Sequence, residues 1–398
     1  MLVTIVITLI LIGVIDRLFL DTSNAVGIGV ALNTITTNSS TIGNQLVQDA
    51  ERMIGPNSTP GGFLVIVHRR YLDVKEAIPS GGERGSGNIV RSDMLTFFTD
   101  STLSNATPFA SIAPANGSTY YNDLASTTAR VWYGHGLHVK PDGTASGTDL
   151  GQGLDMLSNQ WILCRQSALL FDPGVFSAPP YNSYTHASNA KAGGVVSNTA
   201  YPDTPLQLRF ALTDLIAQRL SNEIHTDIAG SYHDTARNYA YYVAVNRLRV
   251  NPTPSGSNME SWRIAQMHPY LAGNVSDFIV EFAADVAAPK DGSVDLDTSG
   301  NIKWYNGFDD ETTLSAWNGG NTNYFPMTIN GSGSTTDYSF VWRHDDDATT
   351  EASLWPHLIR VRYRMHDFAG KVAGAGQDNA GKPYGGVWFE QIIKVNRP

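Results

Sequence analysis

MLVTIVITLILIGVI, residues 1–15, contains no charged side chain and only two hydroxyl groups. A helix that spans a membrane normally needs about 20 apolar residues, whereas 10 to 14 fit the core of a signal peptide better. This run falls between the two lengths. A cleavable signal also needs a basic start and a small-residue cleavage site, yet no Lys or Arg precedes Arg17. We therefore expect the run to be the membrane-spanning start of a longer helix.

The apolar pattern continues beyond the run with the spacing of a helix. Isoleucines recur every seven residues, with a companion row four residues on, which is typical of a helix that packs along other helices. No proline occurs before Pro56, and Gly55-Pro56 is a helix stop. One helix over residues 1–54 would be about 80 Å long. The residues expected to form its packing stripe are Ile28, Leu32, Ile35, Ile42 and Leu46.

The segment LVTIVITLILIGVIDRLF, residues 2–19, resembles the start of mature type IV pilins and pseudopilins. That resemblance implies a membrane-embedded helix that continues into a water-exposed half and carries a β-rich head. The Gly, the aromatic residue and the Glu of the family's processing motif are absent, and Met1 aligns roughly with the sixth mature position. Either the natural start lies upstream, or the chain has lost the processing site. We expect the former, because five more apolar positions would bring the run to about 20 residues.

The composition of the chain narrows the classes of partner and of covalent crosslink that remain possible. The chain has 398 residues with 27 basic and 37 acidic side chains, a net charge of −10, and a pI of about 5.4. This acidic balance argues against a nucleic-acid partner. The single cysteine, Cys164, excludes an intrachain disulfide and lies in an apolar stretch, so we expect a buried thiol.

Past Pro56, short apolar runs alternate with loops rich in Gly, Ser, Asn, Thr and Pro, which is typical of a β-rich domain. In LIRVRYRMH, residues 358–366, three arginines fall on one face, and Ile, Val, Tyr and Met fall on the other. The predicted strands are Gly62 to His68, Met94 to Thr99, Ala129 to Val139, Trp161 to Leu170, Phe278 to Ala283, Ile302 to Tyr305, Tyr338 to Arg343, Leu358 to His366 and Val387 to Val395.

Two stretches break this β pattern. Residues 204–224 have a helical apolar face with a capping residue and Pro205 in the first turn, and His233 to Val250 is a weaker helix candidate. The long loops at 79–92, 101–127, 141–159, 172–203 and 317–337 are expected to be elaborations on a smaller β scaffold.

Several head segments extend the family resemblance. ARVWYGHGLHV, WILCRQSALL, NVSDFIVEFAADV and LIRVRYRMHD look like strands of the larger minor pilins and of J-type minor pseudopilins of type II secretion. The resemblance implies an α+β chain in three parts: a transmembrane half-helix at residues 1–20, an extracytoplasmic half-helix at 21–55, and a β-rich head at 56–398 with extended loops and one or two inserted helices.

By the same resemblance, the chain is a structural subunit without enzymatic activity, anchored in the inner membrane with its head in the periplasm or cell exterior. Its implied partners are other pilin or pseudopilin subunits and the inner-membrane assembly platform. Prepilin peptidase joins them if the natural start lies upstream.

The residues give little support for catalysis or zinc. The sequence has no nucleophile elbow, zincin motif or P-loop. The adjacent His-Asp pairs, such as His366-Asp367, are expected to be surface or strand-end pairs, because a catalytic triad needs a geometry that adjacency does not supply. His135 and His138 have opposite strand parity, so they should not share a metal.

DLDTSGNI, residues 295–302, is the best ligand candidate. Asp295, Asp297, Ser299 and Asn301 have the alternating spacing of a calcium loop, but the twelfth position is Asn306 where such a loop needs Glu. The alternative reading is an Asx-rich turn between strands.

A second function class stays open. A signal-anchored extracytoplasmic hydrolase or carbohydrate-binding protein could use exposed tryptophans as sugar platforms. Carboxylates and exposed aromatic rings in one cleft would favour it, and a head without a deep polar pocket would favour the filament subunit. The tryptophans concerned are Trp132, Trp161, Trp262, Trp304 and Trp317.

The position of the start is testable in the nucleotide sequence. We expect the frame upstream of Met1 to encode a basic residue, then Gly, an aromatic residue and Glu. Sequencing the region checks this directly, and an in-frame stop codon there would contradict the upstream start.

Overall fold

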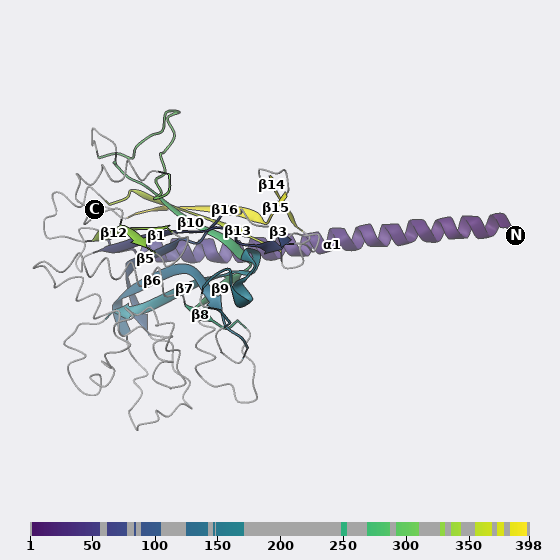
Figure 1. The fold of residues 1–398 in the computed structure, drawn as a ribbon, viewed down its shortest axis with the longest axis horizontal. Coiled ribbons are helices and arrows are strands. Elements are labelled where there is room, and N and C mark those ends of the chain that lie inside the picture. Colours follow the sequence, from purple (N-terminus) through teal and green to yellow (C-terminus); the bar gives the residue numbers. More distant parts are fainter. Residues whose placement is uncertain are drawn as a thin grey trace, which may run out of the picture.

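A computed structural model describes residues 2–55, 62–77, 83–84, 89–104, 125–141, 146–147, 149–170, 248–252, 269–286, 292–309, 327–330, 336–343, 355–367, 372–377 and 383–395. One long helix projects from a head built of antiparallel sheets, and the N-terminus lies at the far end of the helix (Figure 1).

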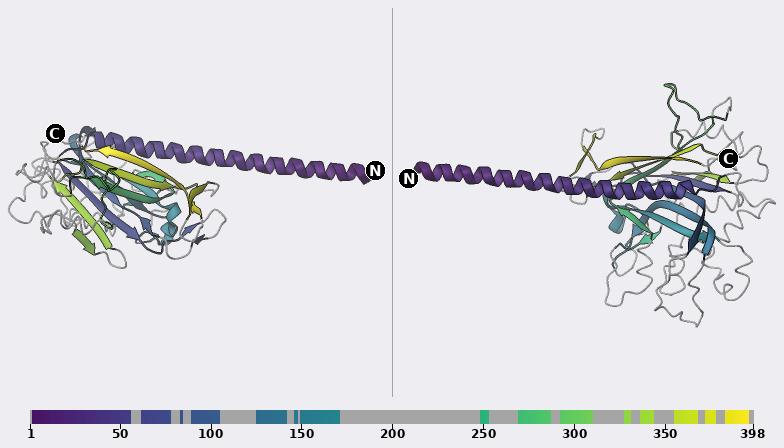
Figure 2. Two further views of the ribbon diagram at one scale, coloured as in Figure 1. Left: turned by 90° about the horizontal axis from the view of Figure 1, so that it is seen from above. Right: turned by 180° about the vertical axis from the view of Figure 1, so that it is seen from behind.

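Helix α1, Leu2–Glu51, is unbroken over 50 residues, as the sequence predicts to within a few positions. After the helix the chain joins the head at once: Ile54 N donates to Phe98 O at 2.8 Å, and Asp100 N donates to Arg52 O at 2.8 Å. Figure 2 shows the first part of α1 free of the head and the last part lying along it.

Among the described residues, the larger sheet has nine strands with the central order β11-β12-β1-β5-β6-β7-β9, and neighbours along this path are antiparallel. Short strand β4 pairs with β1, and β8 pairs in parallel with β6. The strands are β1 Phe63–Tyr71, β4 Val90–Arg91, β5 Met94–Ser104, β6 Ala125–His138, β7 Ile162–Leu170, β8 Arg249–Val250, β9 Tyr270–Gly273, β11 Met327–Asn330 and β12 Thr336–Arg343.

The smaller sheet has the order β10-β13-β16, also antiparallel, with β10 Val275–Ala283, β13 Leu358–Met365 and β16 Val387–Lys394. The predicted alternation in β13 is confirmed. Ile359, Val361, Tyr363 and Met365 are buried in the core, while Arg360 and Arg362 lie on the other face. Two small hairpins complete the described strands, β2 Glu76–Ala77 with β3 Glu83–Arg84, and β14 Ala373–Gln377 with β15 Pro383–Gly385.

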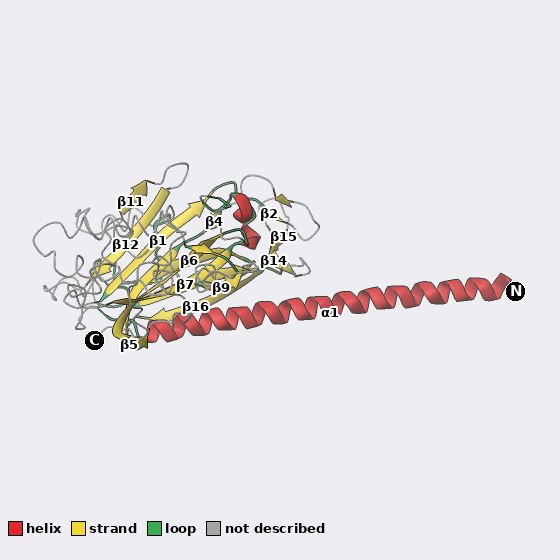
Figure 3. Cartoon of the chain, turned by 90° about the horizontal axis from the view of Figure 1, so that it is seen from below, coloured by secondary structure: helices red, strands yellow, loops and turns green. Residues whose placement is uncertain are grey.

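One core joins the last part of α1 to the inner faces of both sheets (Figure 3). Aromatic rings supply much of it, and Phe282 contacts Phe340 and Trp342 edge-on across the sheets, at centroid distances of 5.2 and 5.0 Å. Since burial of apolar area drives folding, the docked part of α1 belongs to the folded head rather than to a separate stalk.

Most strand predictions are confirmed, with ends shifted by a few residues. The exception is Ile302 to Tyr305, which forms only isolated bridges to Leu296 and Phe282. The predicted helix at 204–224 lies outside the described residues. The second helix candidate does too, apart from its end, where Arg249–Val250 is strand β8 and not helix. Within the predicted loops, the structure places strands β3, β4 and β11 and two 3-10 turns, η1 Gly153–Asp155 and η2 Ser158–Gln160.

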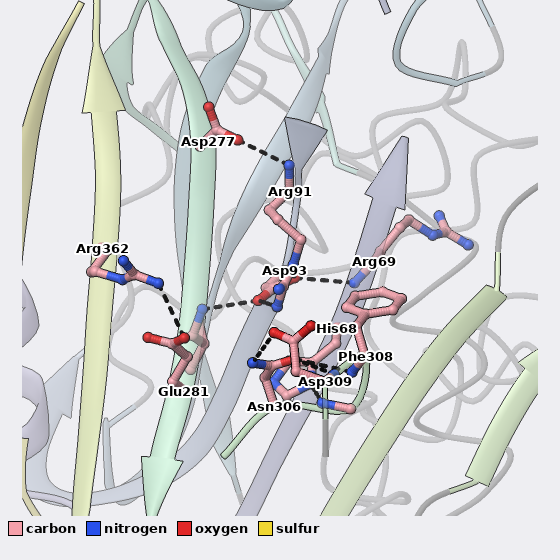
Figure 4. Close-up of polar contacts among 12 residues, drawn as sticks. His68, Arg69, Arg91, Asp93, Asp277, Glu281, Asn306, Phe308, Asp309 and Arg362 are labelled. Atoms are coloured by element: carbon pink, nitrogen blue, oxygen red, sulfur yellow. Dashed lines mark hydrogen bonds and ion pairs between the residues drawn. The ribbon is translucent and has the colours of Figure 1, made fainter. Parts of the chain in front are cut away.

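A buried carboxylate connects the two sheets. Asp93, between β4 and β5, is fully buried and accepts hydrogen bonds from Arg69 N at 3.1 Å in the larger sheet and Val280 N at 2.9 Å in the smaller (Figure 4). Arg91 faces the same carboxylate, with Nε 3.0 Å from Oδ1. Charged hydrogen bonds of this kind fix the relative position of the sheets.

The segment from Asn306 to Asp309 covers this network. Nδ1 of His68 accepts a hydrogen bond from Gly307 N at 2.7 Å (Figure 4). The guanidinium groups of Arg70 and Arg91 each lie 4.7 Å from the Phe308 ring centroid. Burial lowers the pKa of His68, and the nearby Arg91 charge lowers it further. His68 is therefore a neutral acceptor beside a charged pair.

The Asp93 network predicts a pH effect on stability. Burial raises the pKa of Asp93 from 3.8 to about 6, although Arg91 and the backbone N–H groups act in the opposite direction. Between these values the folded chain binds a proton that the unfolded chain does not, so the stability contributed by this group falls as the pH rises.

We expect the unfolding free energy of the wild type, relative to Asp93→Asn, to fall by about 1 to 3 kcal/mol between about pH 4 and pH 6.5. Denaturant unfolding of the full chain in detergent at several pH values measures this. Parallel pH profiles for the two proteins would show that Asp93 does not titrate in this window.

Candidate functional site: the helix and its junction with the head

Helix α1 has two halves with different surroundings. Residues 3–30, here called the free half, are exposed apart from the half-buried Gly27, with apolar side chains such as Val3 at 72% and Val30 at 62% exposure. By length and composition this helix can cross a membrane. Residues 31–51, the docked half, bury one face in the head core.

The predicted packing stripe is divided between these halves. Ile35, Ile42 and Leu46 are 3%, 0% and 0% exposed and pack inside the chain's own head. Ile28 and Leu32 are 40% and 42% exposed. The sequence pattern predicts that the five residues form one contact surface. In the structure, only Ile28 and Leu32 of these five are exposed enough to contact another molecule.

Polar contacts fix the docked half to the larger sheet. The Asp49 carboxylate, 7% exposed, accepts two hydrogen bonds from Arg165 of β7, from Nε at 2.6 Å and from Nη2 at 2.7 Å. Tyr133 of β6 donates its hydroxyl to the same carboxylate, and Gln45 adds a bond from its amide at 3.1 Å. Burial and the Asp49 charge raise the pKa of Tyr133, so it stays a donor. Sequence reasoning missed this cluster, because its members are far apart in the chain.

A second contact fixes the same half to the smaller sheet. Tyr363 of β13 lies 3.0 Å from both the hydroxyl and the carbonyl oxygen of Ser39. One turn further on, a side chain at Gly43 would meet Gln391 Oε1 and Tyr363 Oη at ordinary contact distances of 3.6 and 3.9 Å. The helix is thus held by both sheets at once.

A groove of about 440 Å³ opens where the free half ends. Its helix side includes Gly27, Ala31 and Thr34, and its head side includes Asn274, Met365 and Asp367. Asn274 forms the tight corner between β9 and β10 at a φ of 59°, a conformation that Asn tolerates better than most residues. Its carbonyl accepts a hydrogen bond from His366 N at 2.8 Å, which holds the two head segments together.

The predicted calcium loop at residues 295–302 forms a turn. The carboxylates of Asp295 and Asp297 accept hydrogen bonds from different groups. Asp297 Oδ1 accepts hydrogen bonds from the N–H groups of Ser299 and Asn301, which lower its pKa. Asp295 Oδ2 instead accepts from Val286 N and the Tyr305 hydroxyl. Among the described residues no group of three or more His, Cys, Asp or Glu side chains is placed to hold a metal ion. Calcium at this loop stays a prediction.

Histidines near serine or aspartate have structural partners. Nδ1 of His135 lies 2.8 Å from the Ser92 hydroxyl, and its Nε2 lies 2.9 Å from Val275 O, but both side chains are fully buried, out of reach of a substrate. His138 pairs separately with Asp155 at 2.6 Å. Cys164 is buried, as predicted, and forms no disulfide.

The five tryptophans considered as sugar platforms differ in exposure: two are buried, one is half-buried, and two lie outside the described residues. Trp132 and Trp161 are 2% and 0% exposed, so neither ring is available to a ligand. Trp304 is half-buried beneath the Arg360 guanidinium, 4.5 Å from its ring. Trp262 and Trp317 lie outside the described residues.

The Asp49 cluster predicts that two equivalent substitutions on helix α1, one in each half, change the unfolding free energy by different amounts. Asp49→Asn should lower the unfolding free energy by about 2 to 4 kcal/mol, because it leaves the partly buried Arg165 without its carboxylate. The control Asp21→Asn, on the free half, should stay within about 0.5 kcal/mol of the wild type. Denaturant unfolding of the full chain in detergent measures both, and equal values for the two variants would contradict a docking role for Asp49.

Comparison with known proteins identifies no relative: no family model matches the chain, and neither the curated proteins nor the solved structures include a significant match.

Proposed function

We propose that the chain is a minor pilin or pseudopilin, a structural subunit of a type IV pilus or of a type II secretion-like filament, anchored in the inner membrane before assembly. The observation that carries this proposal is the continuous helix α1. Half of it is exposed and apolar, and half of it is built into a β-rich head.

The continuity of α1 supports a filament role. A hydrolase needs only a short anchor and a flexible linker, whereas here 50 helical residues pass without a break from the apolar terminus into the head core. A rigid connection transmits the position of the helix to the head. A subunit whose work is to place its head at a set distance from neighbouring helices needs this connection.

In this proposal the start of the free half, up to residue 20, first lies in the inner membrane, and the free half then packs against sister subunits when the assembly platform lifts the chain. Ile28, near the end of the free half, and Leu32, at the start of the docked half, supply exposed contacts. Prepilin peptidase acts on the chain if its natural start lies upstream. The protein makes and breaks no bond, and the head presents a surface to other subunits or to cargo.

The exposed and buried members of the stripe allow a direct test. We expect Leu32→Asp to keep the thermal midpoint of the full chain but to remove it from filaments, because a charge would be buried between helices. Ile42→Asp should instead unfold the head, since Ile42 is fully buried. Quantitative blots of membranes and of purified filaments, from cells that overproduce the assembly system, measure incorporation.

Asn33→Asp is the matched control, because Asn33 is exposed beside Leu32 and already polar. It should be incorporated like the wild type. The proposal fails if the wild-type chain is absent from filaments. The assigned contact fails if Leu32→Asp is incorporated as well as Asn33→Asp.

A further inference from the structure

We propose that strand β16 binds an extended segment of a different protein, which adds to the open edge of β16 as an antiparallel strand. The segment carries an acidic, an apolar and a basic residue at alternate positions. This inference goes beyond the proposed function and uses it only to exclude a second copy of the chain as the partner.

β16 is a long and regular edge strand. All eight of its residues pair with β13 without a register shift, and it contains no proline or glycine. Other sheet edges in the described part of the chain are short, as in the four-residue strands β9 and β11, or bridged, as β10 is by Ser92 and Asp93. Natural proteins usually shorten, bend or cover an edge strand, because its unpaired backbone groups attract other chains.

The backbone groups at this edge are open. Val395 N donates to His357 O at 3.0 Å, directly after the last paired residues of β16 and β13. Since bonded and non-bonded pairs alternate along an antiparallel ladder, the N–H and C=O groups of the even-numbered residues of β16 point away from β13. Gln391 Nε2 donates to one of them, Ile392 O, at 3.3 Å. Among the described residues no other hydrogen bond occupies this edge.

The side chains of the same even-numbered residues define the chemistry of the partner. Trp388, Glu390 and Ile392 are about half exposed, and Lys394 is exposed. Arg360 Nη1 lies 3.9 Å from the Glu390 carboxylate, too far for a hydrogen bond, so this carboxylate can accept one from a partner.

Opposite charges face each other in a stable strand pair. An antiparallel partner therefore places an acidic residue opposite Lys394, an apolar residue opposite Ile392 and a basic residue opposite Glu390. From its N-terminus, the partner segment has the order acidic, apolar, basic. Backbone hydrogen bonds supply affinity in this mode of recognition, and the alternate side chains supply specificity.

A second copy of the chain does not fit this edge. β16, drawn in yellow, runs roughly along α1 (Figures 1 and 2). An antiparallel copy of β16 would pair Glu390 with Lys394, but its α1 would point the opposite way, whereas copies anchored in one membrane point the same way. A parallel copy in register would place like charges beside each other, which is destabilising. The partner is therefore a different chain, free to approach in the antiparallel direction.

Fluorescence anisotropy of labelled peptides with the full chain in detergent tests the order of charges. The peptide Glu-Thr-Val-Thr-Lys-Thr-Val matches the antiparallel order, with its last Val opposite Trp388. The peptide Lys-Thr-Val-Thr-Glu-Thr-Val exchanges the two charges. We expect the wild type to bind the first peptide about tenfold more tightly, because two cross-strand charge pairs change from attractive to repulsive.

The double variant Glu390→Lys with Lys394→Glu should reverse this preference and favour the second peptide by roughly the same factor. Both side chains are exposed, so the variant should keep the thermal midpoint of the wild type.

N-methylated peptides test the backbone pairing itself. In the antiparallel register the amide of the first Val, opposite Ile392, faces β16, and the amide of the Thr that follows it faces away. A methyl group on that Val amide should abolish binding. The matched control, a methyl group on that Thr amide, should change the affinity by less than about twofold.

The edge assignment is overturned if neither peptide binds, if the wild type binds both equally, if the double variant does not reverse the preference, or if the two methylated peptides lose binding equally. A dimer of wild-type chains in detergent that the first peptide dissociates would assign the edge to a second copy and overturn the proposed partner. Peptide binding is measured without filaments, so its failure leaves the proposed function standing, and a chain absent from filaments can still bind the peptide.

Discussion

The structure depends on how one nearly uncharged helix is buried along only half of its length. Between residues 22 and 48 α1 carries no charge, yet the head covers it only from Ala31 onward. The Asp49 carboxylate, held by Arg165 and Tyr133, lies at the end of this docked half and ties it to the larger sheet. Without that docking, the inner faces of both sheets would lose the element that covers them.

The two sheets also need each other. Asp93 accepts backbone hydrogen bonds from one strand of each sheet, and Arg91 balances its charge in the interior. Removing either member of such a pair leaves a buried charge without compensation. The head therefore depends on two carboxylates, one that holds the helix and one that joins the sheets.

The sequence predicts the elements of this fold better than it predicts their contacts. Strict alternation in Leu358–Met365 identifies β13, because a half-buried strand needs it. Ile302 to Tyr305 has a similar composition but forms only isolated bridges, since Leu296 and Phe282 meet it singly. Strand composition predicts local preference, whereas pairing depends on distant partners.

The predicted packing stripe of α1 also shows that the sequence predicts an element better than its contacts. A seven-residue repeat predicts that Ile28, Ile35 and Ile42 share a face, and it does not specify what covers that face. The head covers the last two and stops short of the first. The groove and the Asp49 cluster join helix residues to head residues at least 84 positions away, so no local pattern could reveal them.

The junction after the helix also determines how the molecule carries mechanical load. A pull along α1 reaches β5 through the bonds of Ile54 to Phe98 and Arg52 to Asp100, while Asp49 passes part of it to β7. Tension is therefore shared among attachments on β5 and β7, which flank β6, before it reaches the rest of the head. With a single cysteine in the chain, no intrachain disulfide limits how far the head can extend once these attachments give way. Its resistance to force depends wholly on how many of these noncovalent attachments must break together.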